Sequence, residues 1–365
     1  MRLWIALGAT AVMAGAWTAC ITNRDEPGGY TTAATGGGFT TGPGLGPGSG
    51  GNQNLGGGLA VIEDPEAPCD ASVAIDTEDP VQAAAAIGIC KQAENDDDWG
   101  LVEAKWTMGN GAPIPTDALD SYHIGHGVLD DFGAEVDPLE GDKVLGLSSG
   151  TARNPDEPGY QDVSGYDKGY QGSFVTGLSY QSPACPGVVQ TGQPHDIVAL
   201  ELRLRAPEGA QGIAFDFNFF TYEWPDFVCS QFNDYFAAMM TPSPNNELNI
   251  SFDAEGNFIT VNIALVEVCD CGNGPPCDAG MLTYECNEGA SMLTGTGFEG
   301  DPSTFTHAAT GWLSTQAPLA AGENIIVRFA VWDSGDGVLD STAIVDNFRW
   351  LGFAEPDPET TPIPK

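Results

Sequence analysis

The sequence has very little positive charge. Its 365 residues include 12 Lys and Arg against 51 Asp and Glu, which gives a formal net charge of −39. Nucleic acids and anionic membrane surfaces are bound through clusters of basic side chains, so this composition argues against both as partners. We expect no nucleic-acid partner, and the natural counterparts of this chain are cations.

Long apolar runs are missing after the first 20 residues, so the sequence predicts no transmembrane helix. The start has a cation at Arg2, an apolar run that ends at Trp17, and small residues before Cys20. This is the pattern of a secretion signal. The stop at Cys20 resembles a bacterial lipobox, which implies removal of 1–19 and a lipid on the Cys20 sulfur. An ordinary signal peptide with a chance Cys is the alternative.

We therefore expect an exported protein that touches the membrane only through an N-terminal lipid, at the bacterial outer membrane or cell surface. Residues 20–66 are dominated by Gly, Thr, Ser and Pro. Such a segment buries too little apolar surface to offset its ordering entropy, so we interpret it as a flexible tether with a reach of about 35–40 Å. The Pro-rich tail, 354–365, is also expected to be disordered.

The body between tether and tail is long enough for a sizeable core. One helix is signalled, because Asp79 can cap it and Pro80 suits its first turn, so 67–98 is interpreted as a helical entry segment. The stretch 99–353 has no βαβ rhythm and consists of short strand patterns between Gly, Pro, Asn and Asp. The predicted fold is mainly β: an antiparallel β-sandwich, jelly-roll-like, with one short N-terminal helix and long loops.

Alternation of apolar and polar residues is clearest in two neighbouring runs. In DIVALELRLR the leucines recur at every second position, and after a turn through Pro207 and Gly209 the side chains of Phe215, Phe217 and Phe219 share one face. A period of two is the signature of a strand with one buried face. These runs predict two strands that contribute to the core.

Nine cysteines fit an exported protein. If Cys20 carries lipid, eight remain, and an even number in an oxidising compartment predicts four disulfides with 105 possible connectivities. The cluster CDCGNGPPCDAGMLTYEC could otherwise be a zinc knuckle, which export disfavours. The disulfide candidates are Cys69, Cys90, Cys185, Cys229, Cys269, Cys271, Cys277 and Cys286.

The stretch VWDSGDGVLDSTAIVDNFRW, residues 331–350, gathers four acids beside a strand. Two carboxylates 4 Å apart repel by about 1 kcal/mol in water and by about 4 kcal/mol at an effective dielectric constant of 20. Calcium accepts six to eight oxygens in flexible geometry and would relieve that repulsion. A solvated acidic loop is the alternative. The predicted structural Ca²⁺ ligands are Asp333, Asp336, Asp340, Asp346 and Asn347.

A second acidic and aromatic segment, FDFNFFTYEWPDFVCSQFNDYFAAMM, could complete a metal site or line a ligand groove. The alternative is core packing of its phenylalanines, with Asn and Asp in turns. The residues proposed for this second region are Asp216, Glu223, Trp224, Asn233 and Asp234.

Several motifs in one order resemble the choice-of-anchor L domain: FDFNFFTYEWPDF…FNDYFAA, NISFDAEGN, LTGTGF, GLSSGTAR and the long run from AATGWLSTQ to IVDNF. The likeness spans about 99–353. It implies a bacterial surface protein with a β-rich fold and no established enzymatic activity. The residues that match the family's pattern are Glu223, Pro225, Asn233, Asp234, Trp312, Asp340, Ser341, Asp346 and Asn347.

Enzyme patterns are weak. GLSSG places Ser148 as in a nucleophile elbow, but such an elbow runs directly into a helix, and Pro155 and Pro158 follow instead. We therefore expect a non-enzymatic, lipid-anchored surface protein with a Ca²⁺-stabilised β-sandwich that acts in adhesion, ligand binding or envelope structure, with a surface glycan or protein as ligand. The alternative is a secreted glycan-binding module, or a hydrolase that uses the acids of the same loops.

Overall fold

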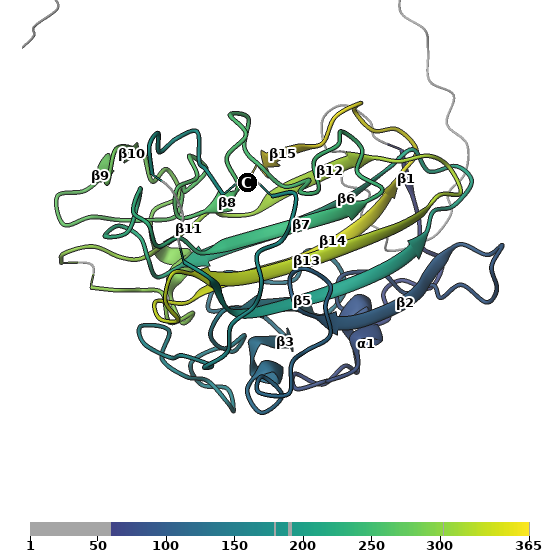
Figure 1. Cartoon of the computed structure of the whole chain (residues 1–365), viewed down its shortest axis with the longest axis horizontal. Coiled ribbons are helices and arrows are strands. Elements are labelled where there is room, and N and C mark those ends of the chain that lie inside the picture. The colour runs from purple at the N-terminus through teal and green to yellow at the C-terminus, as the bar shows by residue number, and fades with distance from the viewer. Residues whose placement is uncertain (1–59, 179, 189–191, 302, 365) are drawn as a thin grey trace, which may run out of the picture. The chain divides into compact units, whose positions relative to one another are not determined.

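The computed structural model describes residues 60–178, 180–188, 192–301 and 303–364. The expected signal peptide, Cys20 and most of the tether lie outside these residues. The described chain forms two antiparallel β-sheets packed face to face (Figure 1), so the predicted β-sandwich with one short helix is confirmed. Within the described ranges, no helix is long and apolar enough to cross a membrane.

The larger sheet, sheet A, has eight strands. Its spatial order is β15–β12–β6–β14–β4–β3, with β1 also paired to β14 and β11 to β6. The strands are β1 (Val61–Ile62), β3 (His126–Leu129), β4 (Val144–Ser148), β6 (Gly212–Thr221), β11 (Ala308–Ala309), β12 (Leu313–Pro318), β14 (Ser341–Leu351) and β15 (Glu359–Pro362).

The smaller sheet, sheet B, has five strands in the order β2–β5–β13–β7–β8. A separate hairpin pairs β9 with β10. These strands are β2 (Gly100–Thr107), β5 (Pro194–Arg205), β7 (Tyr235–Thr241), β8 (Ile259–Thr260), β9 (Cys277–Ala279), β10 (Leu282–Tyr284) and β13 (Asn324–Ser334). The single α-helix is α1 (Pro80–Ala85), and the short 3-10 helices are η1 (Tyr122–Gly125) and η2 (Ser291–Leu293).

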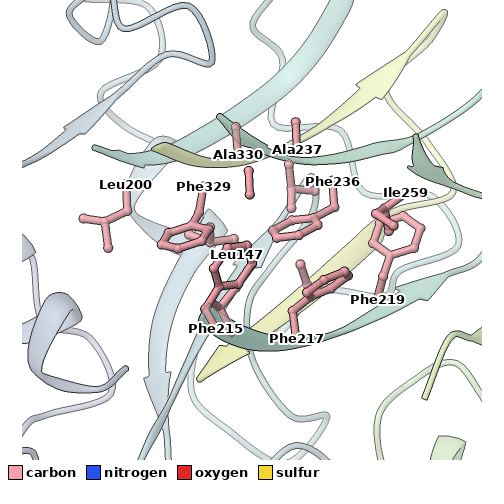
Figure 2. Close-up of a cluster of buried hydrophobic side chains, with 14 of the residues drawn as sticks. Leu147, Leu200, Phe215, Phe217, Phe219, Phe236, Ala237, Ile259, Phe329 and Ala330 are labelled. Carbon is pink, nitrogen blue, oxygen red and sulfur yellow. The ribbon is translucent and has the colours of Figure 1, made fainter. Parts of the chain in front are cut away.

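The core lies between the two sheets and is rich in aromatic side chains (Figure 2). Phe215 of β6 packs edge-on against Phe329 of β13, with ring centroids 4.8 Å apart, and Phe217 packs against Phe236 of β7 at 4.6 Å. Aromatic pairs of this kind add about 0.5–1.5 kcal/mol beyond the area that they bury. The alternation in the sequence therefore predicted the inward face of β6 correctly.

Consecutive strands often belong to different sheets. The turn through Pro207 and Gly209 does not close a hairpin, because β5 lies in sheet B and β6 in sheet A. The chain crosses again from β6 to β7 and from β13 to β14. As a result, the end of β6, the start of β7, the end of β13 and the start of β14 all meet at one end of the sandwich (Figure 1).

The predicted helix is present but short. The Asp79 carboxylate accepts a hydrogen bond from Val81 N at 2.9 Å, and Pro80 occupies the first helical position. Side-chain capping of this kind stabilises a helix start by about 1 kcal/mol. The helix covers six residues, and most of the expected entry segment 67–98 is irregular.

Both boundaries of the body lie further out than the sequence suggested. The end of the expected tether pairs with sheet A, because Val61 lies opposite Leu351. The tail expected to be disordered contributes β15, whose Thr360 pairs with Thr315 of β12. The consecutive β-branched residues Thr360 and Thr361 suit a strand, and an edge position tolerates the flanking prolines. Composition alone therefore misplaced both boundaries.

All eight predicted cysteines are joined in disulfides within the described chain. Three bridges tie loops over 17 to 44 residues, and one closes a loop of six. The zinc alternative for the cysteine cluster therefore has no free thiols to use. The pairs are Cys69–Cys90, Cys185–Cys229, Cys269–Cys286 and Cys271–Cys277.

Candidate metal centre

Two buried acids face each other at the end of sheet B where the strands of the two sheets meet. Strands β13 and β7 pair as far as Trp332 and Tyr235, so the next residues in register are Asp333 and Asp234. Besides burial, the negative charge of Asp234 raises the pKa of Asp333, so the two carboxyl groups lie close together. Residues directly opposite in an antiparallel pair project to the same face, and like charges there are destabilising. The alternation of β13 directs Asp333 inward with Phe329.

Two further acids reach the same place from the loops that flank sheet A. Glu223 follows β6, and its Oε2 accepts a hydrogen bond from Asp234 N at 2.9 Å. Asp340 precedes β14, and its carbonyl oxygen accepts one from Tyr222 N at 3.1 Å, which ties the two loops together. Each of these acids is 2% exposed or less. We call Glu223, Asp234, Asp333 and Asp340 the acidic cluster.

The acidic cluster contains oxygens that bond to nothing else in the described chain. Both oxygens of Asp333, Oδ1 of Asp234, Oδ2 of Asp340 and Oδ1 of the neighbouring Asn233 are buried without a hydrogen-bond partner there. A buried polar atom without a partner destabilises the fold by about 1–3 kcal/mol, and by more if it is charged. So many unpaired oxygens in one place favour a shared proton or a bound cation.

The first turn after β4 supplies the polar wall of the cluster. Ser149 Oγ donates to Asp234 Oδ2 at 3.4 Å and accepts from Ser341 N at 2.9 Å. At Gly150 a Cβ atom would lie 2.1 Å from Asp340 Oδ2. Only glycine therefore leaves space for the Asp340 carboxyl group in its present place.

Burial and mutual repulsion disfavour four ionised carboxylates in the acidic cluster. Burial, reinforced by neighbouring acids, raises the pKa of Asp333, and burial likewise raises the pKa of Glu223 and of Asp234. Burial also raises the pKa of Asp340, against the opposing effect of Lys168. An isolated buried acid would stay protonated, whereas a bound cation would hold these groups ionised.

Lys168 is a buried cation next to the acidic cluster. Its Nζ donates to the Ser148 carbonyl oxygen at 2.8 Å, and burial lowers its pKa to about 8, while Asp196 and Asp340 act to raise it. Below that pH it carries one positive charge close to Asp196 and Asp340. The single positive charge of Lys168 leaves most of the negative charge of an ionised acidic cluster uncompensated.

The side chains of the acidic cluster and Asn233 offer only oxygen donors. These are carboxylate oxygens and one amide oxygen, which suit Ca²⁺ and Mg²⁺, whereas zinc sites use Cys and His. Asp336 is exposed and raises the pKa of three members of the cluster, so it lies near the entrance. Across the described ranges, no three His, Cys, Asp or Glu side chains already stand in a metal-binding arrangement. Binding would therefore require side-chain rotation, which the flexible coordination of calcium tolerates better than that of Mg²⁺.

Asp346 and Asn347 do not join the other three predicted ligands. Asp346 lies six residues beyond Asp340 along β14, about 20 Å away. It faces away from the core, because the neighbouring Val345 faces inward. Its carboxylate accepts from the N–H groups of Leu139 and Glu140 at 2.6 and 3.1 Å, and burial raises its pKa to about 7.

Asp216, proposed for the second region, lies beside this pair. Its carboxylate accepts hydrogen bonds from Arg349 at 2.7 and 2.8 Å and from Asn347 Nδ2 at 2.7 Å. This is a satisfied ion pair on the outer side of sheet A. Asp216 therefore has no free oxygen set for a metal.

Trp224 is also separate from any exposed ligand surface. Its side chain is 1% exposed and packs edge-on against Tyr284, with ring centroids 6.0 Å apart. Its carbonyl oxygen lies 3.0 Å from His307 Nδ1. A side chain buried in this way cannot stack on a sugar without unfolding of the loop.

The structure thus combines parts of both predicted sets. Asp333, Asp340 and the nearby Asp336 come from the first, and Glu223, Asn233 and Asp234 from the second. Sequence reasoning missed Lys168 and Ser149 altogether. The motif GLSSG contains Ser149 and Gly150 of the site, whereas its central Ser148 is buried and its Oγ accepts a hydrogen bond from Thr342 Oγ1 at 2.9 Å.

Comparison with known proteins assigns this chain to no family. No protein-family model matches the chain, and no curated protein matches it either. The resemblance to the choice-of-anchor L domain therefore stays a prediction from the motifs quoted above. What the chain does has to be argued from its own site.

Proposed function

We propose that this chain is a non-enzymatic bacterial surface protein, exported and lipid-anchored through Cys20, whose β-sandwich binds a structural Ca²⁺ ion at the acidic cluster. The observation that supports the metal most directly is the facing pair Asp234 and Asp333, which is buried and has three unpartnered oxygens in the described chain. Folding such a pair is favourable only with shared protons or a shared cation, and millimolar calcium is typical outside the cell.

The role of the ion in this proposal is to hold loops together. The cluster unites the segments after β6, before β7, at the end of β13 and before β14, which come from both sheets. A site with a dissociation constant near 10⁻⁴ M would add about 1.4 kcal/mol at 1 mM calcium. The ordered loops would then present a surface for adhesion, ligand binding or envelope structure, as motifs resembling the choice-of-anchor L domain imply.

Thermal unfolding tests the metal. The melting temperature of the wild-type body should rise with Ca²⁺, rise less with Mg²⁺ and fall with chelator, and an Asp340→Asn variant should lose most of this response. The exposed Asp117→Asn variant removes one acid elsewhere and should respond like wild type. No response to calcium in the wild-type protein would refute the site.

The anchor has its own test. Cells fed a labelled lipid precursor should incorporate label into the wild-type chain and none into a Cys20→Ser variant. If wild type carries no label, the anchor is refuted while the calcium site stands or falls on the melting experiment.

A further inference from the structure

A groove lies at the end of the sandwich opposite the acidic cluster. It is an open groove of about 700 Å³ over the outer side of sheet B. The groove begins near Ile325, about 26 Å along β13 from Asp333, so the two sites are independent. It is lined by Ala93, Glu94, Asn95, Asp96, Val102, Arg203, Arg205, Thr241, Pro242, Asn324, Ile325 and Ile326.

Two arginines in this groove have no partner anywhere in the described residues. Arg203 is exposed and Arg205 is half-buried, and neither makes a side-chain hydrogen bond or ion pair there. Glu103, which lies opposite Arg203 in β2, pairs with Lys105 at 3.4 Å instead. In a chain with 51 acids and 12 Lys and Arg, two unpaired guanidinium groups side by side are unexpected.

The other described cations all have partners. Lys91 pairs with Asp98 at 2.8 Å, and Arg349 pairs with Asp216 at 2.7 Å. The remaining Lys and Arg of the described chain bond to carboxylates or to backbone carbonyl oxygens: Lys105, Lys143, Arg153, Lys168 and Arg328. Among the described Lys and Arg, only the two arginines of the groove therefore lack a partner.

Alternate residues of a strand project to the same face about 7 Å apart, so Arg203 and Arg205 point into the groove together. A guanidinium group matches a carboxylate through two parallel hydrogen bonds. Glu94, Asn95 and Asp96 on the rim offer acceptors for hydroxyl groups, while Val102, 47% exposed, offers an apolar surface. Carboxylate, hydroxyl groups and an apolar ring face are together the features of a uronic acid.

From this lining we infer that the groove binds a carboxylate-bearing saccharide, a short oligouronate, with its carboxylate on Arg203 and Arg205. The acids on the rim and the net charge of −39 disfavour densely charged polyanions. A volume of about 700 Å³ falls in the usual range for small-ligand sites. The site goes beyond the proposed calcium function and does not depend on it.

Calorimetric titration with trigalacturonate tests the inference, with equal free Ca²⁺ in cell and syringe. Wild type should bind it, whereas the fully methyl-esterified trimer, which keeps the sugar and loses the charge, should bind roughly ten- to 100-fold more weakly. An Arg203→Gln/Arg205→Gln variant should lose affinity by a similar factor. Lys143→Gln removes a cation that pairs with Asp130 outside the groove and should bind like wild type.

Three results would overturn the inference. The first is no binding of trigalacturonate at about 5 mM, a concentration that detects millimolar affinities. The second is equal affinity of the double variant, after its unchanged melting temperature has shown that it is folded. The third is equal binding of a triglutamate peptide, which would mean that the groove recognises carboxylates without the sugar.

Discussion

Asp333 and Asp234 face each other just beyond the last pair of the β13–β7 ladder, Trp332 and Tyr235, and both side chains are buried. The two residues are almost 100 positions apart in the sequence, and each is flanked by strand residues that pack the core. Their opposition is therefore fixed by the register of two central strands of sheet B. The two backbones cannot separate here without breaking that register, so only side-chain rotation can change the distance between the carboxyl groups.

Replacing Asp333 by Asn should have opposite effects with and without calcium. In chelator, the variant should be more stable than wild type by about 1–4 kcal/mol, because one buried charge or obligatory proton is removed. In millimolar calcium the advantage should shrink or reverse, because a ligand is lost. Urea unfolding in both conditions measures this, with Asp117→Asn as control. Equal destabilisation in both conditions would contradict the calcium site.

The metal-free protein should lose stability as pH rises. The folded pKa values of Asp346, about 7, and of the three cluster aspartates lie above the ordinary 3.8 for Asp, and that of Glu223 lies above the ordinary 4.5 for Glu. Groups with raised pKa values take up protons on folding, so they stabilise the fold fully below about pH 4, and this contribution is lost as pH rises through their folded pKa values.

Calcium should reverse this trend, because it competes with protons for the same carboxylates. The gain in unfolding free energy between chelator and calcium should therefore grow between about pH 5 and pH 8. Lys168 deprotonates only near pH 8 and above, so it has little effect over most of this range. A calcium response that is independent of pH would contradict binding at these acids.

Gly150→Ala should weaken the calcium response without removing any ligand. The new methyl group would lie 2.1 Å from Asp340 Oδ2, so the carboxyl group must rotate away. We expect a loss of about 1–3 kcal/mol from overpacking and a weaker calcium shift. Gly165→Ala is the matched control, because nothing lies within 4 Å of its Cβ position. Melting curves for the two variants should differ clearly, and similar curves would refute the steric argument.

The loss of stability on removal of a disulfide should increase with the length of the loop that the disulfide closes. Replacing Cys185 and Cys229 by Ser opens a loop of 44 residues and should destabilise the fold by up to about 4 kcal/mol. Replacing Cys271 and Cys277 opens a loop of six, with an expected loss of about 2 kcal/mol. Cys229 also lies in the loop that carries Asp234, so only the first variant should weaken the calcium response. Equal calcium responses in both would contradict this coupling.

Arg349→Met should be strongly destabilising, because it leaves Asp216 buried without its ion pair. Asp216 is 2% exposed, and breaking a buried pair from one side typically costs about 3–5 kcal/mol. The double variant Arg349→Met/Asp216→Leu should recover most of that loss. Urea unfolding measures both, and full stability of the single variant would contradict the importance of this pair.

Local rules predicted much of the fold. The period of two identified the inward face of β6, and Asp79 with Pro80 marked the start of α1, since both signals depend only on neighbouring residues. The sheet to which each strand belongs was not predictable. The turn at Pro207 and Gly209 would suit a hairpin equally well, and only packing over the whole domain decides that β5 and β6 separate.

The candidate site shows the same division between local and distant information. Alternation could have placed Asp333 inward, two positions after Val331, and Asp346 outward beside Val345. The closeness of Asp333 to Asp234 and the position of Lys168 depend on contacts between distant segments. Spacing in the sequence grouped the four late acids, whereas the strand period separates Asp346 from the rest.

The disulfide Cys69–Cys90 determines how a pull on the N-terminal side would travel through the protein. Strand β1 is held to β14 by only two residue pairs and would peel away first. The tension would then reach Cys69 and pass through the covalent bridge to the residues beside β2. Helix α1 lies inside the bridged loop, so it would carry none of the load. The bridge is thus a mechanical stop that shields the only α-helix of the described chain from forces transmitted along its leading segment.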